Sequence, residues 1–326
     1  MERQYKSGMA STIRAFLEQK HSLGFKYVEN QRYLYNFDDM CYKKFPHETT
    51  ITREMGMEWA ISLQGENKGG MARRMSPVRE LARFMIRMGK KAFVIPEEFG
   101  KNPPYRNYEP HIFTHEELVA LFHAADNLPY NVKYPFSALQ PPVYLRLLYA
   151  CGLRPHEGRL ILRENIDLSN GTIFIPESKK SRDRIVVMDN IMLNICQKYD
   201  RRAKSIDKDS EYFFPTQKTN STNYPHHDSH WGARVLNTCL VNANLTNFDG
   251  NKPRPYDLRH TFATHTLYRW LREGKNLDNC LPYLSAYMGH EHFQHTAYYI
   301  HLIPDFFPQI QLSSTKKFGF IIPEVK

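Results

Sequence analysis

Two arginines and a tyrosine lie in surroundings that suit chemistry on a phosphate group. Arg259 belongs to the segment 255–264, PYDLRHTFAT, in which apolar residues recur at helical spacing. The buried side of the expected helix therefore also carries a guanidinium, and a buried charge is costly unless it is paired. A phosphate pairs with arginine through two parallel hydrogen bonds. A second arginine, Arg154, and a late tyrosine, Tyr299, occur in equally suggestive contexts.

Such residues could break a phosphodiester bond without a metal ion. Two arginines hold the phosphate oxygens and stabilise the charge that builds on them during displacement. A tyrosine hydroxyl attacks once its proton is removed or an electropositive site lowers its pKa. A lysine beside the leaving 5′ oxygen can donate a proton, and a histidine can bind a non-bridging oxygen. The phosphotyrosine ester keeps the energy of the broken bond, so a strand can be rejoined without ATP.

The first part of the chain, to about residue 100, reads as helical. Helical apolar spacing predicts helices over 12–20, 33–42, 52–63 and 71–91, the third capped by Thr52. In the fourth, three arginines lie four residues apart and share one face, with Leu81, Phe84, Met85 and Met88 on the other side. No glutamate stands at the matching positions, which favours a ridge that follows DNA phosphates over a merely solvated face. The three are Arg79, Arg83 and Arg87.

A polar, proline-bearing stretch that ends near residue 110 predicts a domain boundary. We expect a helical domain over 1–105, a linker over 106–111, a mixed domain over 112–310 and a tail over 311–326. The mixed domain opens with a capping box, Thr114 with Glu117.

The mixed domain also carries strand signals. Asn170-Gly171 between the apolar runs 166–168 and 172–175 predicts a β-hairpin, and 184–188 predicts a further strand. Helices resume near residue 190 and dominate to the end. The fold class is therefore α+β, with a small antiparallel sheet flanked by helices.

The composition of the chain indicates a globular protein with an anionic partner. The chain has 326 residues, 41% of them hydrophobic, and a formal charge of +10, which suits two globular domains and a polyanionic partner. An acidic membrane or an acidic protein would also satisfy the charge. Five scattered cysteines without CxxC spacing indicate neither a disulfide framework nor a zinc ribbon. No run is long enough to span a bilayer and no signal peptide is evident, so a reducing cytosol is the simplest location.

Taken in order, these pieces resemble the tyrosine recombinase (phage integrase) family. The matching residues are Gly152-Leu153-Arg154 with Glu157, the hairpin lysine, the segment 258–264 (LRHTFAT), Gly289-His290 and the segment 296–301 (TAYYIH). The likeness covers about 112–303 fully, and it extends more loosely to the first domain, which looks like the family's helical core-binding domain. The resemblance implies Tyr299 as nucleophile, Arg154 and Arg259 as the phosphate clamp, Lys179 as acid and His290 as a phosphate contact.

One position departs from the family pattern. Where the family usually has a histidine two residues before the Leu of its second arginine motif, this chain has Tyr256. A phenol with a pKa of about 10 is a poor base at neutral pH, although it can still bind phosphate. Proton transfer at this position is therefore in doubt, and we assign Tyr256 a binding role.

Several other polar residues could have a structural role or a role outside catalysis. Glu157 fits a carboxylate that orients an arginine, and His260 fits a structural residue because it follows Arg259 on a different helix face. Lys180 and Arg182 compete with Lys179 and are expected to contact DNA. Two histidine clusters, 226–230 and 290–301, lack zinc spacing, so no metal and no cofactor is expected.

The resulting expectation is a site-specific DNA recombinase that works through a 3′-phosphotyrosine intermediate and serves integration, excision or transposition of a mobile element. It would act on double-stranded DNA as a homotetramer, be a monomer or weak oligomer when free, and lie in the cytoplasm with the nucleoid. The apolar tail, 318–323, would dock on a neighbouring subunit or pack on its own domain. Three rivals stay open: a catalytically impaired DNA-binding protein of the same fold, a type IB topoisomerase and a metal-dependent nuclease.

Overall fold

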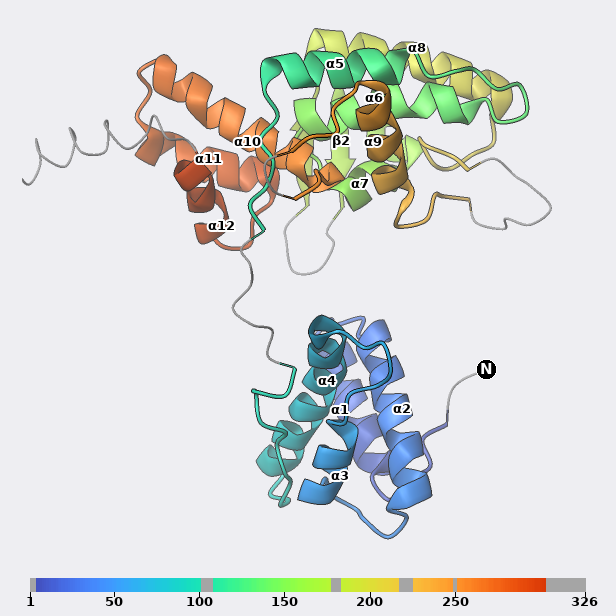
Figure 1. Cartoon of the computed structure of the whole chain (residues 1–326), viewed down its shortest axis with the longest axis vertical. Helices are drawn as coiled ribbons and strands as arrows, with labels where there is room; N and C mark the ends of the chain where they lie inside the picture. Colours follow the sequence, from blue (N-terminus) through green and yellow to red (C-terminus); the bar gives the residue numbers. More distant parts are fainter. Residues whose placement is uncertain (1–3, 101–107, 177–182, 217–224, 249–250, 303–326) are drawn as a thin grey trace, which may run out of the picture. The chain divides into compact units, whose positions relative to one another are not determined.

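The computed structural model describes residues 4–100, 108–176, 183–216, 225–248 and 251–302. The chain divides into two compact units, Met1–Tyr108 and Glu109–Lys326 (Figure 1). Among the described residues, no helix is both long and apolar enough to cross a membrane.

The first unit is built from helices alone within the described residues: α1 (Ala10–Ser22), α2 (Val28–Lys44), α3 (Arg53–Trp59) and α4 (Lys68–Arg87). The Thr52 hydroxyl accepts a hydrogen bond from the Met55 amide at 3.3 Å, which confirms the predicted N-cap of α3. Helix α4 begins earlier than predicted because the Asn67 side chain caps it through the Gly70 amide, at 2.7 Å. Met88, predicted on the buried side, is 63% exposed because α4 ends before it.

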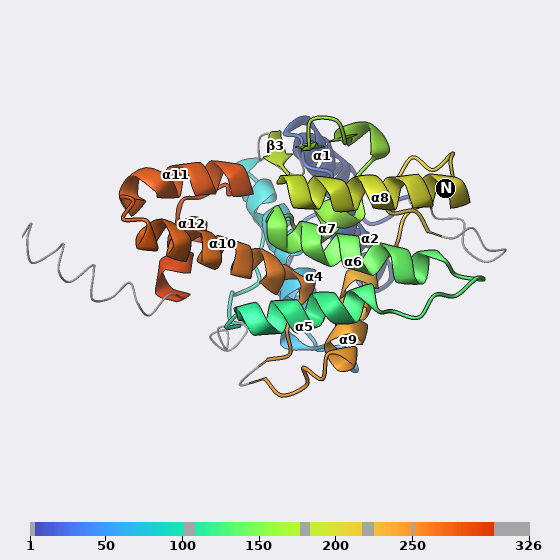
Figure 2. The same cartoon turned by 90° about the horizontal axis from the view of Figure 1, so that it is seen from above.

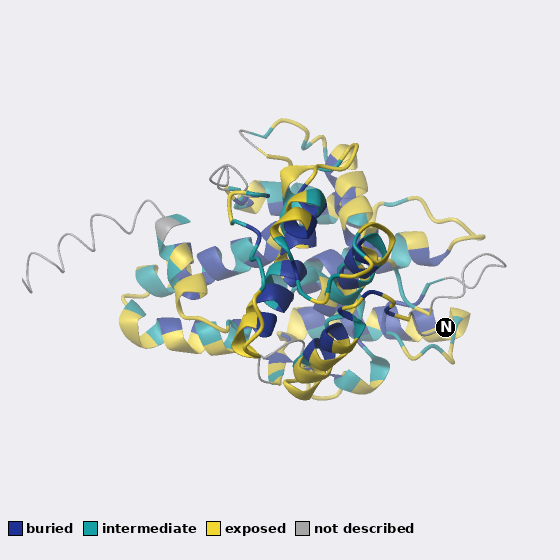
Figure 3. Ribbon diagram, turned by 90° about the horizontal axis from the view of Figure 1, so that it is seen from below, coloured by how far each residue is buried: buried dark blue, intermediate teal, exposed yellow. Residues whose placement is uncertain are grey.

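The second unit packs a helical layer against a short sheet. Helices α5 (His115–Asp126), α6 (Phe136–Ala150) and α8 (Asn190–Ile206) lie side by side, and α9 (Trp231–Asn242) packs against α5 and α6 (Figure 2). The capping box of Thr114 with Glu117 at the start of α5 is confirmed. Along the helices, buried residues alternate with exposed ones, as amphipathic spacing requires (Figure 3).

The sheet confirms the predicted hairpin. Strands β1 (Ile166–Asp167), β2 (Thr172–Ile175) and β3 (Arg184–Val187) are antiparallel in the order β1-β2-β3, with Ile175 opposite Arg184. The Asp167 carboxylate accepts hydrogen bonds from the backbone amides of Ser169 and Asn170 and fixes the turn before β2. The fold class is therefore α+β, as predicted.

The last helices form a second apolar cluster beside the main core. The short α7 (Pro155–Arg159) precedes the sheet, and α10 (Pro255–Arg272), α11 (Leu277–Met288) and α12 (Gln294–Ala297) follow it, with a 3₁₀ turn over Tyr298–Leu302. Leu267 of α10, Leu284 of α11 and Tyr299 of the 3₁₀ turn share this cluster. Tyr299 is thereby held against α10, the helix that carries Arg259.

Candidate active site

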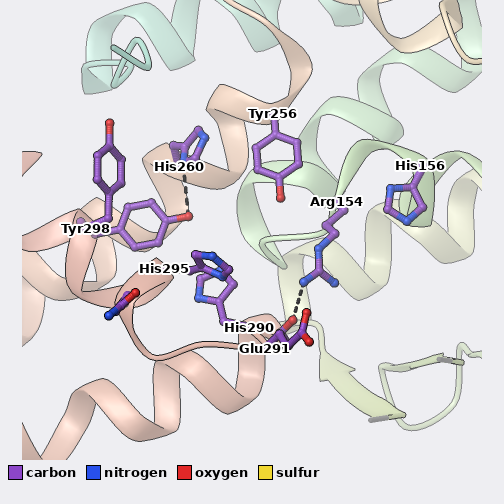
Figure 4. A pocket seen from close by; sticks show the side chains of 11 residues that line it. Arg154, His156, Tyr256, His260, His290, Glu291, His295 and Tyr298 are labelled. Atoms are coloured by element: carbon purple, nitrogen blue, oxygen red, sulfur yellow. Dashed lines mark hydrogen bonds between the residues drawn. The ribbon is translucent and has the colours of Figure 1, made fainter. Parts of the chain in front are cut away.

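One pocket of about 650 Å³ collects most of the predicted site residues. Its lining comes from α7, α10, the turn after α11, and α12 with the 3₁₀ turn that follows it (Figure 4). The α7 segment is distant in the chain from the other three, and the hydrogen bond between Arg154 and Gly289 joins residues that are 135 positions apart. The lining residues are Arg154, His156, Tyr256, His260, Gly289, His290, Glu291, Gln294, His295, Tyr298 and Tyr299.

Arg154 is held in the pocket wall by a carboxylate and a backbone carbonyl. Its guanidinium donates to the Glu157 carboxylate at 2.7 Å and to the Gly289 carbonyl oxygen. Glu157 also accepts two hydrogen bonds from Arg184 at 3.0 and 2.6 Å. Burial alone would raise the pKa of Glu157, but hydrogen bonds and charge from Arg184 and Arg154 outweigh it and lower the pKa to about 2. Glu157 therefore orients an arginine, as predicted, and the structure adds Arg184 as a second one.

Gly289 is required by this arrangement. It lies just after α11 in the left-handed region, at φ +64°, where a residue with a Cβ is strained. A Cβ at this position would also lie 3.0 Å from the Nη1 atom of Arg184. The glycine thus lets its own carbonyl reach Arg154 while Arg184 packs on the other side.

Arg259 is placed differently from the expectation. Its side chain is fully buried, it does not line the pocket, and it donates to the carbonyl oxygens of Gly152 at 2.5 Å and Met288 at 2.6 Å. Its Nε has no hydrogen-bond partner among the described residues. Burial lowers the pKa of Arg259. The sequence reasoning assigned a phosphate to this charge, whereas the described conformation gives it backbone carbonyls and no carboxylate contact.

Tyr299 has its ring in the apolar cluster and its hydroxyl at the pocket. The residue is 2% exposed, whereas its neighbour Tyr298 is 40% exposed. Burial raises the pKa of Tyr299 to about 12, and the charges of Arg259 and Arg154 only partly oppose the rise. We expected an electropositive site to lower this pKa; in the described conformation, desolvation is the larger effect.

His260 was missed as a site residue. The sequence reasoning set it aside as structural, but its Nδ1 lies 3.2 Å from the Tyr299 hydroxyl (dashed line from His260 in Figure 4). Burial, followed by the charges of Arg259 and Arg254, lowers the pKa of His260 to about 4. Its position directly after the second arginine was visible in the sequence, but the packing of the 3₁₀ turn on α10 that brings Tyr299 to it was not.

His290 lies beside Tyr299, with the two rings nearly parallel and their centroids 6.0 Å apart. Its Nδ1 is 2.6 Å from the Thr296 hydroxyl. Burial and then the charges of Arg259 and Arg154 lower the pKa of His290 to about 3, so the ring is neutral at pH 7. When Thr296 donates to Nδ1, the remaining ring nitrogen carries the proton and can donate to an anion.

Tyr256 is half-exposed and faces Arg154 rather than Tyr299. Its hydroxyl points into the pocket toward the Arg154 guanidinium (Figure 4), and the two groups interact electrostatically. The ring lies 5.1 Å from that of His260, one helical turn later. The phenol that replaces the family's usual histidine thus supports an arginine.

The remaining predicted residues lie elsewhere or outside the described part of the chain. Lys179, Lys180 and Arg182 fall within 177–182, which is not described. In the first unit, Arg79 donates to the carbonyl oxygens of Ile95, Pro96 and Phe99. Arg83 is exposed and 3.4 Å from Glu97, and Arg87 is exposed. Thus one arginine of the predicted ridge anchors the segment after α4, while two extend into solvent.

The histidine clusters show contacts of other kinds. His227 stacks on Trp231 with ring centroids 4.0 Å apart and lies 2.7 Å from the side-chain oxygen of Gln140. Within the described ranges, no group of three His, Cys, Asp or Glu side chains could hold a metal ion.

Comparisons with family models, related sequences and solved structures all indicate the same protein family. The model of the Phage integrase family matches residues 111–305. The putative integrase/recombinase y4rB of Sinorhizobium fredii is 28% identical over 301 residues, covering 90% of this chain and 93% of that protein. Tyrosine recombinase XerC of Oceanobacillus iheyensis is 27% identical, with coverages of 76% and 75%. The Tn1549 transposon integrase, solved with a circular intermediate DNA, shares the fold with a TM-score of 0.60 at 14% identity, covering 88% of this chain and 94% of that one.

Proposed function

Because this chain is a tyrosine-type site-specific recombinase of the phage integrase family, we propose that Tyr299 attacks a DNA phosphate and forms a covalent 3′-phosphotyrosine bond. The observation that carries this proposal is the convergence of the Tyr299 hydroxyl, Arg154 and His290 on one pocket from separate segments. A phenol, a fixed guanidinium and a neutral imidazole are the groups that displacement at a phosphodiester needs.

Each group has a distinct role in this proposal. Arg154 and the free ring nitrogen of His290 bind the non-bridging oxygens, and Tyr256 supports Arg154. The bound phosphate replaces water around the guanidinium, so its hydrogen bonds act in a site of low polarity. Lys179 gives its proton to the departing 5′ oxygen; this assignment rests on the family resemblance.

Arg259 acts from behind the pocket wall in the described conformation. Its charge influences both Tyr299 and Tyr256. Direct contact with phosphate requires its carbonyl partners, Gly152 and Met288, to yield one of their hydrogen bonds. A guanidinium that loses a carbonyl and gains a phosphate exchanges a neutral acceptor for a charged one, which favours the exchange.

We propose duplex DNA as the partner and a homotetramer on DNA as the working assembly, since exchange joins two duplexes. The net charge of +10 supports phosphate binding. Arg83 and Arg87 of the first unit, together with Lys180 and Arg182, are the proposed contacts with the DNA backbone, whereas Arg79 holds the segment after α4. The protein would move a mobile element in the cytoplasm, at the nucleoid.

Because Tyr256 replaces the family's usual histidine, one alternative remains: a catalytically impaired DNA-binding protein of the same fold. A suicide substrate distinguishes this alternative from an active recombinase. Duplexes tiled across the DNA that flanks the gene carry a nick, so that cleavage releases a short strand and traps the adduct. Wild-type protein and Tyr298→Phe should form an adduct that survives detergent, and Tyr299→Phe should bind the same duplex without forming one. Binding without any adduct from wild-type protein would favour the alternative.

A further inference from the structure

The Tyr299 hydroxyl has a neighbour that can accept a proton. His260 lies on α10, and its Nδ1 is 3.2 Å from that hydroxyl. Within the described part of the chain, it is the hydrogen-bond partner of the hydroxyl. This distance is at the long end of the range for a hydrogen bond, and it is short enough for the proton to pass from the hydroxyl to Nδ1 without movement of either residue.

The other groups around the pocket are placed for different tasks. The Tyr256 hydroxyl points toward Arg154 and interacts with that charge (Figure 4). The Nδ1 of His290 is engaged by Thr296, and its ring stacks beside that of Tyr299. The nearby guanidinium groups cannot take a proton, since they stay protonated at all ordinary pH values.

We propose that His260 is the general base for Tyr299, in the reaction proposed above, on which this inference rests. The Tyr299 O–H bond breaks and its proton passes to Nδ1 of His260 while the phenolic oxygen bonds to phosphorus. The bond from phosphorus to the 5′ oxygen breaks, and that oxygen takes a proton from the general acid. In rejoining, the 5′ hydroxyl gives its proton back to the deprotonated general acid and bonds to phosphorus, the bond from phosphorus to the phenolic oxygen breaks, and that oxygen recovers the proton from His260.

Burial and the surrounding charges keep both His260 and Tyr299 in their neutral forms in the absence of DNA. Several titratable or charged groups face His260. On its own element these are Arg254 at the start of α10, with Tyr256 and Arg259 on that helix. Tyr299 of the 3₁₀ turn and His290 of the turn after α11 lie on the other elements packed against it. Burial and the two arginines keep the imidazole neutral at pH 7, so Nδ1 can accept a proton in the tautomer that carries its proton on Nε2. Burial also keeps the proton on Tyr299.

A phosphate in the pocket changes this balance. Its negative charge favours the protonated imidazole and offsets the positive charge of the arginines. The phenol also becomes more acidic as its oxygen bonds to phosphorus. The proton therefore moves as that bond forms, which confines the reactive phenolate to the DNA complex.

The chain offers a matched control on the same helix. His265 makes the same kind of contact, with its Nδ1 3.1 Å from the Tyr149 hydroxyl, but it does not line the pocket. His260→Asn keeps an acceptor near the position of Nδ1 but cannot take a full proton. His260→Ala leaves space for added imidazole.

The experiment measures the rate of adduct formation on the nicked duplex between pH 5 and 9. We expect His260→Asn to slow it about 100-fold or more, with DNA affinity unchanged, and imidazole to restore part of the rate in His260→Ala with an optimum near its own pKa. His265→Asn should leave the rate unchanged.

Two results would overturn the inference. Adduct formation at the wild-type rate in His260→Asn shows that the proton goes elsewhere. A slow His260→Ala protein that imidazole does not rescue, with folding intact by circular dichroism, shows a purely structural role. A failure of the proposed function is distinct: wild-type protein itself would then form no adduct.

Discussion

Replacing Glu157 by glutamine tests how the arginine pair is held. Glu157 is 8% exposed and accepts hydrogen bonds from Arg154 and Arg184. Its pKa is lowered from an ordinary 4.5 to about 2. That difference corresponds to about 3 kcal/mol of folding free energy supplied by the ionised carboxylate. Glutamine keeps the shape but leaves two buried guanidinium groups without their counterion, so we expect the free energy of unfolding to fall by about 3 kcal/mol at pH 7.

The effect has a defined pH dependence. A carboxylate with a lowered folded-state pKa contributes its full stability above the unfolded-state pKa, and this contribution disappears as pH falls through the folded-state value. The difference between wild type and Glu157→Gln should therefore be constant above about pH 5.5, shrink below about 4.5, and be largely gone near 2.

Urea denaturation with tryptophan fluorescence measures this difference. A Trp59→Phe background leaves Trp231 and Trp270 as reporters, and both lie in the second unit. Glu273→Gln, an exposed carboxylate beside Lys275, is the control and should change stability little. A loss below about 1 kcal/mol at pH 7, or a loss that does not vary between pH 7 and 3, would refute this account of how Glu157 holds the arginines.

Three further perturbations address the pocket. Gly289→Ala should cost about 1–2 kcal/mol by urea denaturation, because φ is +64° there and the new Cβ would press on Arg184; an unchanged midpoint would show that the turn relaxes freely. Tyr256→Phe should slow adduct formation about tenfold through the lost interaction of the hydroxyl with Arg154, and a rate equal to wild type would contradict the supporting role. Adduct formation should proceed at the same rate in EDTA, since arginines carry the charge stabilisation; dependence on added Mg²⁺ or Zn²⁺ would favour the nuclease reading.

Local sequence signals predicted most of the helices and the small sheet. The capping boxes, the Asn170-Gly171 hairpin and the apolar periodicity each act within a few residues, so the helices and the sheet could be read from the sequence. Helix ends were less accurate. Cap residues such as Asn67, which extends α4 at its start, compete with apolar periodicity for the boundary.

The sequence indicated which types of residue belong to the site, but it did not indicate two of their contacts. Arg259 was correctly placed on the buried face of a helix, but nothing in the sequence showed that the carbonyls of Gly152 and Met288 would enclose it. His260 was set aside because helix-face reasoning considers one helix at a time. Its contact with Tyr299 arises from the packing of a later 3₁₀ turn against α10, a tertiary effect without a local signal.

Locating the point at which the protein is attached to DNA shows whether the Tyr299 oxygen forms the covalent bond. After reaction with the nicked duplex and nuclease trimming, mass spectrometry of the protease-digested adduct identifies the modified residue and the linked nucleotide. We expect a nucleotide joined through its 3′ phosphate to Tyr299. Attachment to Tyr298 or to any other side chain, or linkage through a 5′ phosphate, would contradict the proposed role of Tyr299.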